Sequence, residues 1–600
     1  MRLLRGSRLL ISATSVLLVS CVFAFVSAHS HFNDAAEGGI EACPNDDSGL
    51  TLPSGFCATV FADNIGHARH MVAAPSGVLY VNTWSGRYYG NDTPHAGGFL
   101  VALRDKAAGK ANEIERFGET AATGGAGGTG IGIYENWLYA EINDRIVRYS
   151  LPRGAIVPSD PPETIVSGLP LGGDHPMHPF IITSRGTLYV DVASATNACQ
   201  EKNRTLKSSG LSPCRELETR GGVWRYDANK ANQRFSPAER FATGIRNAEG
   251  FATDAAGRLF VTQHGRDQLH ANWPDLYKPD EEATLPAEEV VLLKDGGDYG
   301  WPACYYDSFR QKLVLAPEYG GDGGKKIGEC ANKIPPAAAF AAHWAPNAMV
   351  HYDKSQFPDH YRNGMFIAFH GSWDRAPYPQ QGYNVVYQPF DGDHASGQCE
   401  IFADGFAGAV RSPEKAAHRP SGLAVGTDGG LYVSDDTAGR IYRIVYRGAP
   451  GNGAAKVVAC PSLTAPAGGI AESEAKPPEG THPDAGAAGT LPLPEGATQE
   501  MVTLGERIYH GQVGGAPCTG CHGSSGEGSP LGPALNGNKW LWSDGSFSGI
   551  SKVITDGVPQ PKQYRSPMPG LGGAQLTADQ VKAVAAYVWA LSHQAKNPSK

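Results

Sequence analysis

The chain has 600 residues, which exceeds the roughly 100 to 200 of one ordinary globular domain and predicts at least two domains, or one repeat-built domain with an appendage. Its 51 Lys and Arg against 60 Asp and Glu leave a formal charge of −9, which argues against a nucleic-acid-binding protein because a basic surface is missing. The 76 Gly and 43 Pro far exceed their usual share and favour many turns between short strands over long helices or disorder.

Residues 1–28 have the pattern of an export signal. Three arginines among the first eight residues precede a mostly apolar stretch over 9–26, and Val26-Ser27-Ala28 fits a small-x-small cleavage site. Two alternatives stay open, because Leu18-Val19-Ser20-Cys21 resembles a lipoprotein cleavage site and the apolar stretch, ~27 Å long as a helix, could almost span a membrane uncleaved. All three interpretations predict a periplasmic or otherwise exported protein, attached to a membrane only through an N-terminal anchor or lipid.

Eight cysteines remain once Cys21 of the signal and the Cys518/Cys521 motif discussed below are set aside. An even number in an exported chain predicts disulfides rather than buried free thiols. Spacing does not determine the pairing, but pairing of neighbours closes the shortest loops. The favoured pairs are therefore Cys43 with Cys57, Cys199 with Cys214, Cys304 with Cys330, and Cys399 with Cys460.

A short phrase, Gly or Asn followed by an aromatic and aliphatic strand, recurs six times. The copies begin at Gly77, Asn136, Gly186, Gly257, Gly364 and Gly430, and most are followed by a second strand at 98–103, 145–149, 222–226, 384–387 or 440–444. Repeated strand–loop–strand units predict an all-β, six-bladed β-propeller over 43–447, with loops gathered at the mouth of a central channel. The repeats are about 70 residues apart, longer than the ~40 to 50 of compact propellers, so the excess belongs to loops. An ordinary β-sandwich with coincidental repeats is the alternative.

Beyond the propeller, residues 448–495 are rich in Pro, Gly, Ala and Glu and predict a linker. The pattern then becomes helical and predicts a small all-α domain over 496–595. A short helix is expected over 499–509. A second, amphipathic helix follows Thr577, where Gln580 completes a capping box.

Cys518-Thr519-Gly520-Cys521-His522 is the strongest signal in the chain. Two thiols at this spacing add to the vinyl groups of a haem, while the adjacent imidazole binds the iron. The motif alone could also serve as a redox disulfide, but its helical context favours haem attachment. Met568, between Pro567 and Pro569, is the one methionine between the motif and the last helix, and it is the expected sixth ligand. The last hundred residues or so resemble class I cytochromes c, in which a haem with His and Met ligands carries electrons.

Seven phrases along the propeller region also occur in a characteristic order. They begin at Gly173, Thr243, His264, Tyr299, Trp344, His370 and Arg419. Together they resemble the soluble pyrroloquinoline-quinone (PQQ) sugar dehydrogenases, especially the sorbosone dehydrogenase-like branch, over roughly residues 50–447. That family consists of six-bladed propellers.

The resemblance implies a base that takes the hydroxyl proton of the substrate while hydride leaves carbon for the quinone. His175 occupies the matching position, and Asp174 beside it is expected to orient or charge-stabilise the imidazole. The alternative for His175 is a structural loop-capping role. A departure from the family is His178, where many relatives carry Arg.

PQQ carries three carboxylates and a flat ring system, so its pocket needs cations and an aromatic or apolar face. The resemblance places at or near the cofactor Arg246, Asn247, His343, Trp344, His370, Arg375 and Arg419. Two positions depart from the family: His370 stands near a family Lys, and Ala417 stands where relatives carry a second Arg, for which Arg375 would compensate. The family also holds a calcium ion with oxygen ligands, expected here at the carbonyl of Pro286 and at Glu288.

The sequence therefore predicts an exported quinohaemoprotein dehydrogenase. A small sugar, aldehyde or alcohol would reduce PQQ, and electrons would pass through the fused haem c to a respiratory acceptor. Two alternatives stay open. One is a non-catalytic propeller that docks a partner enzyme and carries an electron-transfer cytochrome. The other is a propeller lactonase fused to a cytochrome.

Overall fold

The structure is a computed structural model of the chain. It describes residues 46–84, 97–105, 109–120, 127–171, 173–371, 374–376, 378–413, 415–448, 458–463, 491–510, 513, 518–523, 526, 528, 531–537, 539–564 and 566–593. The predicted export signal and most of the predicted linker lie outside these residues. So does Cys43, and with it the predicted pair Cys43–Cys57. The described part of the linker corrects its prediction, because Val458–Ala459 forms a strand that pairs with Glu400–Ala403 of the propeller.

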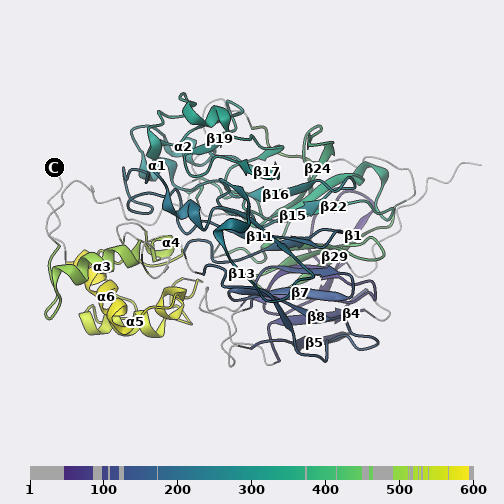
Figure 1. Ribbon diagram of the computed structural model, residues 1–600, viewed down its shortest axis with the longest axis horizontal. Coiled ribbons are helices and arrows are strands. Elements are labelled where there is room, and N and C mark those ends of the chain that lie inside the picture. Colours follow the sequence, from purple (N-terminus) through teal and green to yellow (C-terminus); the bar gives the residue numbers. More distant parts are fainter. Residues whose placement is uncertain are drawn as a thin grey trace, which may run out of the picture. The chain divides into compact units, whose positions relative to one another are not determined.

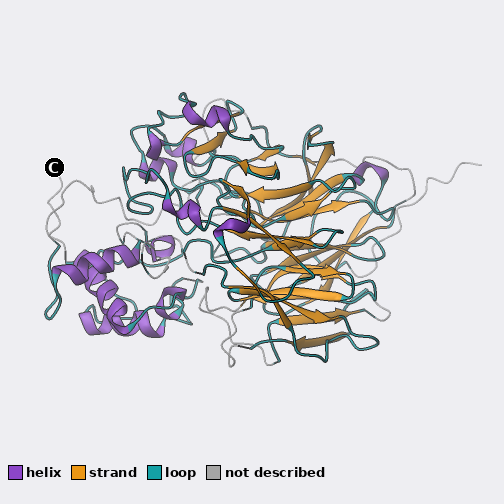
Figure 2. Cartoon of the chain, viewed as in Figure 1, coloured by secondary structure: helices purple, strands orange, loops and turns teal. Residues whose placement is uncertain are grey.

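Six sheets of four or more strands form the first part of the chain (Figures 1 and 2). Blade 1 contains β2 (His67–Ala73), β3 (Leu79–Trp84), β4 (Leu100–Arg104) and β5 (Glu113–Phe117). Blade 2 contains β6 (Ile131–Tyr134), β7 (Trp137–Ile142), β8 (Arg145–Ser150) and β9 (Glu163–Ser167), with β13 (Gln233–Arg234) at its edge. Blade 3 contains β10 (Phe180–Ile182), β11 (Thr187–Val192), β12 (Gly222–Asp227), β14 (Arg240–Thr243) and β18 (Gly297–Asp298).

The second half of the ring has the same organisation. Blade 4 contains β15 (Phe251–Thr253), β16 (Leu259–Gln263), β17 (Glu288–Leu292) and β21 (Ala338–Phe340). Blade 5 contains β22 (Pro346–Tyr352), β23 (Gly364–Phe369), β24 (Asn384–Asp391), β26 (Glu400–Ala403) and β30 (Val458–Ala459), and β25 (His394–Ala395) pairs with β24. Blade 6 contains β27 (Pro420–Val425), β28 (Leu431–Asp435), β29 (Ile441–Tyr446) and the early strand β1 (Phe56–Ala62).

The first strands of the six blades form a closed ring. Contacts run from β2 to β6, β10, β15, β22, β27 and back to β2. Blade 6 closes the ring because β1 pairs antiparallel with β29, so that Cys57 lies opposite Val445. The six-bladed propeller predicted from the repeats is thereby confirmed.

Each repeated phrase leads into the second strand of a blade, namely β3, β7, β11, β16, β23 and β28. These strands are mostly buried on both faces because each blade packs between two others. All six residues of β3 and all six of β23 are buried. The near-continuous apolar runs by which the repeat was recognised in the sequence thus form the hydrophobic cores between neighbouring blades.

The excess residues in the repeats form loops and short elements. Blade 4 carries two long insertions: the one between β16 and β17 contains α1 (Leu269–Asn272) and α2 (Pro279–Glu282), and the one between β17 and β21 contains the hairpin of β19 (Cys304–Asp307) and β20 (Lys312–Leu315). Short 3₁₀ turns lie at Arg215–Glu218, Pro237–Glu239, Pro317–Tyr319, Gly328–Asn332 and Asp359–Tyr361. Three predicted disulfides are confirmed: Cys199–Cys214, Cys304–Cys330 and Cys399–Cys460.

The C-terminal part is helical, with α3 (Gln499–Tyr509), α4 (Cys518–His522), α5 (Phe547–Asp556), the 3₁₀ turn Gly570–Gly573 and α6 (Ala578–Ser592). The predicted capping box at the start of α6 is present, since Thr577 and Gln580 exchange hydrogen bonds of 2.8 and 3.2 Å. The apolar face of α6 packs on α3 and α5. Helix α5 has no counterpart among the sequence predictions.

Helices α3 and α6 cross closely at Gly505. A Cβ atom at this position would lie 1.9 Å from the carbonyl oxygen of Ala583, which is backbone and cannot move aside. We therefore expect Gly505→Ala to destabilise the helical domain by about 3 kcal/mol, the upper range for overpacking. Thermal unfolding followed through the haem absorbance measures this effect. Gly537→Ala is the matched control, because a Cβ there meets no described atom within 4 Å, and equal stability of the two variants would contradict the close crossing.

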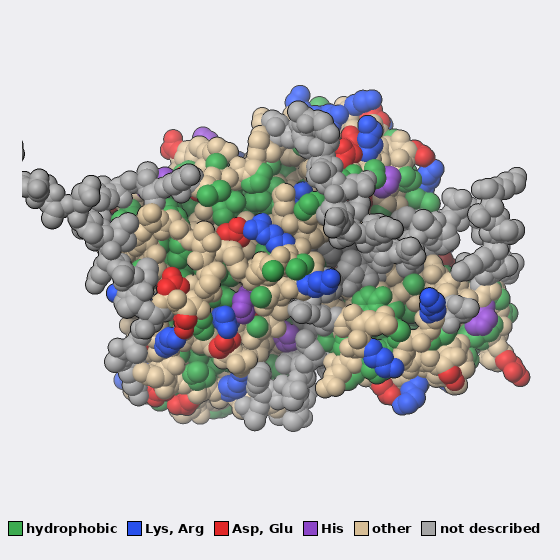
Figure 3. All heavy atoms as spheres, turned by 180° about the vertical axis from the view of Figure 1, so that it is seen from behind, with side chains coloured by type: hydrophobic (Ala, Val, Ile, Leu, Met, Phe, Trp, Pro, Cys, Tyr) green, Lys and Arg blue, Asp and Glu red, His purple; other side chains and the backbone are tan. Residues whose placement is uncertain are grey.

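On the face shown in Figure 3, acidic and basic side chains are interspersed among the coloured residues. This distribution agrees with the absence of a basic surplus in the composition. Among the described residues, no helix has both the length and the apolar character needed to cross a membrane.

Candidate active site and haem site

Loops at the ends of the inner strands line a cavity of the propeller. Of the residues predicted to form the active site, the cavity is lined by Asp174, His175, Arg246, Asn247, Glu288, His343, His370 and Arg419. These side chains come from positions up to 245 residues apart in the sequence. Trp344, Arg375 and Pro286 are not among the lining residues.

His175 has one ring nitrogen engaged by the protein. Its Nδ1 lies 2.9 Å from the carbonyl oxygen of Ser194 and 3.0 Å from the Oγ of the same residue. Because a carbonyl only accepts, Nδ1 carries the proton and the neutral ring keeps its lone pair on Nε2. Burial, aided by the neighbouring Arg246, lowers the pKa of His175 well below 6.5. The imidazole is therefore neutral at pH 7 and able to accept a proton.

Asp174 does not orient His175 through any hydrogen bond in the structure. Its carboxylate instead pairs with Arg204, whose Nε lies 2.9 Å from Oδ2. Arg204 also pairs with Asp267 at 2.9 Å. The expected orienting role thus belongs to Ser194, and Asp174 is part of a buried ion-pair network one residue away. Sequence reasoning missed Ser194 because it lies on a different loop, 19 residues further along the chain.

Most arginines of the cavity are neutralised by carboxylates. Arg246 pairs with Asp267 at 2.8 Å and donates to the carbonyl of Gly265 at 2.9 Å. Arg69 pairs with Glu249 at 2.9 Å and with Asp436 at 2.7 Å. The guanidinium groups of Arg69 and Arg246 therefore contribute to a fixed charge network around the cavity.

Arg419 has a different environment. The hydrogen bonds of its guanidinium go to the backbone carbonyls of His370 and Gly371, and its carbon lies 5.7 Å from the ring centroid of Tyr383. No described carboxylate pairs with it, which leaves its charge available to an anionic ligand. His370 beside it pairs with Asp436 at 2.8 Å, and burial lowers the pKa of His370 to about 4.

Two residues expected near the cofactor belong to the core instead. Trp344 is 2% exposed and packs edge-on against Phe369, with ring centroids 5.2 Å apart. Arg375 is 4% exposed and donates to the backbone carbonyls of Pro379, Ala283 and Ala342. Burial lowers the pKa of Arg375 to about 10. Arg375 therefore does not replace the cation missing at Ala417.

Arg69 and Trp84 are among the cavity residues that were missed at the sequence level. They lie on β2 and β3, and the Arg69 guanidinium carbon is 5.9 Å from the Trp84 ring centroid. The signal that could have revealed Arg69 is its position within the buried inner strand His67–Ala73, because a buried charge needs a partner or a ligand. His178, by contrast, is a buried structural residue whose Nε2 lies 3.0 Å from the carbonyl of Pro170.

The predicted calcium ligands are arranged differently from expectation. The carboxylate of Glu288 accepts hydrogen bonds from the backbone N–H groups of Gly265 at 2.8 Å and Ala345 at 3.0 Å. Burial raises the pKa of Glu288 to about 7. Each amide donates to a different oxygen of the carboxylate, so Glu288 links two loops to β17. Pro286 lies next to Gly265.

The helical domain carries the second site. Neither Cys518 nor Cys521 forms a disulfide, and burial raises the pKa values of these thiols to about 12 and about 11. Redox-active CxxC pairs need a lowered thiol pKa, so these groups do not fit that role. His522 donates from Nδ1 to the carbonyl of Pro533 at 2.9 Å, which directs Nε2 to a metal.

An apolar cavity adjoins these residues. Its walls include Tyr509, Ile550, Ile554, Leu576, Val584 and Val588, and Met568 also lines it. Met568 is held by paired backbone hydrogen bonds to Val558, of 2.7 and 3.2 Å. Two thiols, an imidazole with a fixed tautomer, a thioether and apolar walls fit a covalently attached haem, with His522 and Met568 as the residues that would hold its iron.

Met568→Ala should lower the midpoint potential of the haem, since a thioether ligand raises it. The haem should stay attached, because Cys518 and Cys521 are unchanged. A spectroscopic redox titration measures the shift. Met501→Ala, on α3 and away from the cavity lining, is the control. If the unmodified protein and both variants had the same midpoint potential, Met568 would not be a haem ligand.

The chain belongs to the TrAA12-like family, whose model matches residues 50–447. A second family model, that of cytochrome c, matches residues 502–592. The two matches coincide with the propeller and the helical domain. The propeller is thus of the PQQ-dependent sugar dehydrogenase type and carries a C-terminal cytochrome c domain, as the sequence predicted.

Individual relatives are distant. The chain is 27% identical over 216 residues to an uncharacterised protein of Borreliella burgdorferi, covering 36% of this chain and 51% of that one. It is also 27% identical over 235 residues to the PQQ-dependent pyranose dehydrogenase of Coprinopsis cinerea, covering 34% and 30%. The chain thus spans about half the length of the first relative and less than a third of the second.

Among solved structures, the propeller resembles the calcium structure of a Trichoderma reesei protein of Carbohydrate-Active Enzymes Family AA12. The TM-score is 0.52 at 18% identity, and the alignment covers 66% of this chain and 96% of that one. This likeness supports the fold.

Proposed function

We propose that this protein is an exported quinohaemoprotein dehydrogenase that oxidises a sugar, aldehyde or alcohol and passes the electrons through its own haem to a respiratory acceptor. The observation that carries the proposal is the state of His175, a neutral imidazole whose Nδ1 is held by Ser194 and whose Nε2 is left for a substrate. A base of this kind suits the removal of a hydroxyl proton. The similarity to a PQQ-dependent pyranose dehydrogenase supports the choice of a sugar as substrate.

The residues of the propeller cavity fit PQQ. Arg419 would bind a carboxylate of the cofactor, because no described carboxylate occupies its guanidinium. Trp84 offers an aromatic surface in the same cavity. When bound, PQQ supplies an acceptor for the hydride of the substrate. His175 would meanwhile take the hydroxyl proton on Nε2, and Ser194 would hold the ring in position.

We include calcium in the proposal because the Trichoderma reesei protein that shares this fold was solved as a calcium structure. Oxygen atoms are the ligands that calcium prefers. Glu288 is the predicted ligand that lines the cavity, but both of its oxygens already accept amide hydrogen bonds. Binding of calcium there would have to share these oxygens.

The fused cytochrome domain provides the next electron acceptor. Covalent linkage raises the effective concentration of haem near the quinone site above that of two separate proteins. Met and His ligation suits an electron carrier of raised potential. The export signal proposed for residues 1–28 would place this chemistry outside the cytoplasm, where haem c and disulfides are compatible with the environment.

The test is reconstitution of the purified, haem-loaded protein with PQQ and calcium, followed by a panel of sugars, aldehydes and alcohols. We expect substrate-dependent reduction of the haem, visible in its absorbance, only when PQQ is present. A propeller that merely docks a partner would bind no quinone and reduce no haem. A lactonase would hydrolyse lactones without an electron acceptor.

A further inference from the structure

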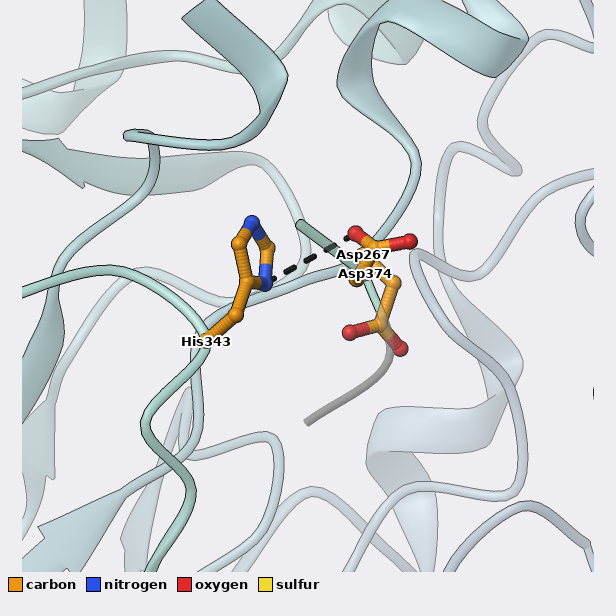
Figure 4. A group of neighbouring side chains, drawn as sticks. All are labelled: Asp267, His343 and Asp374. Carbon is orange, nitrogen blue, oxygen red and sulfur yellow. Dashed lines mark ion pairs between the residues drawn. The ribbon is translucent and has the colours of Figure 1, made fainter. Parts of the chain in front are cut away.

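Asp267, His343 and Asp374 bring three potential metal ligands together beside the propeller cavity (Figure 4). They lie on loops after β16, after β21 and after β23, and so come from blades 4 and 5. One ligand atom from each residue lies within 4.8 Å of the other two. The His343 and Asp374 side chains are each 2% exposed, and that of Asp267 is 17% exposed.

The imidazole of His343 is oriented so that Nδ1 faces the carboxylates. Its Nε2 lies 2.7 Å from the carbonyl oxygen of Glu282 and 3.1 Å from that of Leu285. Both partners are acceptors, so Nε2 carries a proton and Nδ1 is the nitrogen turned toward Asp374. A histidine whose second nitrogen donates to a backbone carbonyl is the usual arrangement of a metal-binding histidine.

His343 and Asp374 face each other without a direct hydrogen bond. The Nδ1 of His343 lies 3.6 Å from Oδ2 of Asp374, beyond the 2.7 to 3.2 Å of a hydrogen bond. The same Oδ2 accepts a hydrogen bond from the backbone N–H of Gln268 at 2.8 Å. Asp267 is already balanced by Arg204 and Arg246, so a bound cation would chiefly serve the buried His343 and Asp374, with Asp267 as the third ligand.

We propose that these three side chains bind a divalent first-row metal ion, of the zinc or manganese type. Ligands about 2.0 to 2.2 Å from one ion lie at most ~4.4 Å apart. The three ligand atoms all lie within 4.8 Å of one another, and His343 Nδ1 and Asp374 Oδ2 are 3.6 Å apart, so their spacing is close to that of a metal site. An imidazole nitrogen with two carboxylates suits zinc or manganese better than calcium, which prefers oxygen ligands. The site is thus chemically distinct from the calcium expected at Pro286 and Glu288.

The metal would act on the cavity through Asp267. The Oδ2 atom of Asp267 accepts from Arg204 at 2.9 Å and from Arg246 at 2.8 Å, and both arginines line the cavity. A metal on this carboxylate would fix its orientation and add positive charge beside the two guanidinium groups. It would also fasten the loops of blades 4 and 5 to each other. Its role is therefore to stabilise and position the cavity wall.

The test measures metal binding to the full-length protein, purified without a histidine tag and stripped with a chelator, in the absence of quinone and substrate. Zinc and manganese are then titrated and quantified by mass spectrometry of the elements. We expect about one tightly bound ion per chain in addition to haem iron, and an increase in the unfolding temperature of the propeller on loading.

Asp374→Asn and His343→Asn should each weaken this binding by more than about 100-fold, since each removes a direct ligand and even outer-shell losses cost 10- to 100-fold. Asparagine at 343 also tolerates the positive φ of 61° found there. The control is His360→Asn, an exposed histidine paired with Glu400, which should bind the metal like the unmodified protein.

Metal binding that is unchanged in both ligand variants, or undetectable in the unmodified protein, would overturn the proposal. If a variant does not fold, as judged by circular dichroism, zinc-soaked crystals of the unmodified protein decide the question. An anomalous peak among the three side chains would support the site, and its absence would refute it. Because quinone and substrate are left out, failure here leaves the proposed dehydrogenase function untouched.

Discussion

Replacement of His175 by Gln should reduce substrate-dependent haem reduction by about 10²- to 10⁴-fold, the usual contribution of a general base. The side chain keeps a polar group near Ser194 but has no basic nitrogen to accept a proton. PQQ binding and the haem spectrum should be unchanged. Steady-state and single-turnover rates of haem reduction measure the loss.

His360→Gln is the matched control for His175→Gln. It replaces an exposed histidine that pairs with Glu400 and does not line the cavity, and it should retain full turnover. Turnover of His175→Gln equal to that of the control would remove His175 as the base.

The pH dependence of turnover follows from the same histidine. Burial lowers the pKa of His175 well below 6.5, so the ring stays neutral and able to accept a proton at pH 7. Activity controlled by this group should therefore persist through pH 6.5 and fall only at more acidic pH, as the ring becomes protonated. A pH profile of kcat/KM that falls already above pH 6.5 would assign the base to another group.

Arg419→Gln should weaken PQQ binding by roughly 10- to 100-fold, the value of one or two charge-assisted hydrogen bonds. The reason is that its guanidinium bonds only to carbonyl groups among the described residues and remains available to a carboxylate. Equilibrium titration of the quinone-free protein, followed by PQQ absorbance, measures the change. Haem content should be unaffected.

Arg411→Gln provides the comparison for Arg419→Gln. Arg411 is 41% exposed at its side chain and already pairs with Asp404. Its replacement should leave PQQ affinity unchanged. Equal affinity of the two variants would show that Arg419 does not bind the cofactor, and Arg69 and Arg246 would then be the next cations to test.

The architecture was predictable because its signals are local. Each repeated phrase is the buried second strand of a blade, and mutual burial between blades forces the same apolar pattern six times. The helices at 499–509 and after Thr577 were predictable for the same reason, since caps and apolar periodicity act over a few residues. Helix α5 was missed because Phe547–Asp556 begins in a Ser- and Gly-rich segment that reads as a loop.

The site was only partly predictable because its contacts are made across blades. Ser194 orients His175, and Asp374 reaches Asp267 and His343, from separate loops. The position of a residue in a motif also does not specify the direction in which its side chain points. Trp344 is therefore buried in the core, whereas its neighbour His343 lines the cavity. These outcomes depend on loop conformation, which sequence spacing does not encode.

The central claim is that substrate electrons pass within one chain from the propeller to the haem. Stopped-flow mixing of the PQQ-loaded protein with substrate under anaerobic conditions, at several protein concentrations, tests it most directly. We expect haem reduction with a first-order rate constant that is independent of protein concentration, because donor and acceptor are covalently linked. A rate constant proportional to protein concentration, or a haem that stays oxidised while substrate is consumed, would contradict it.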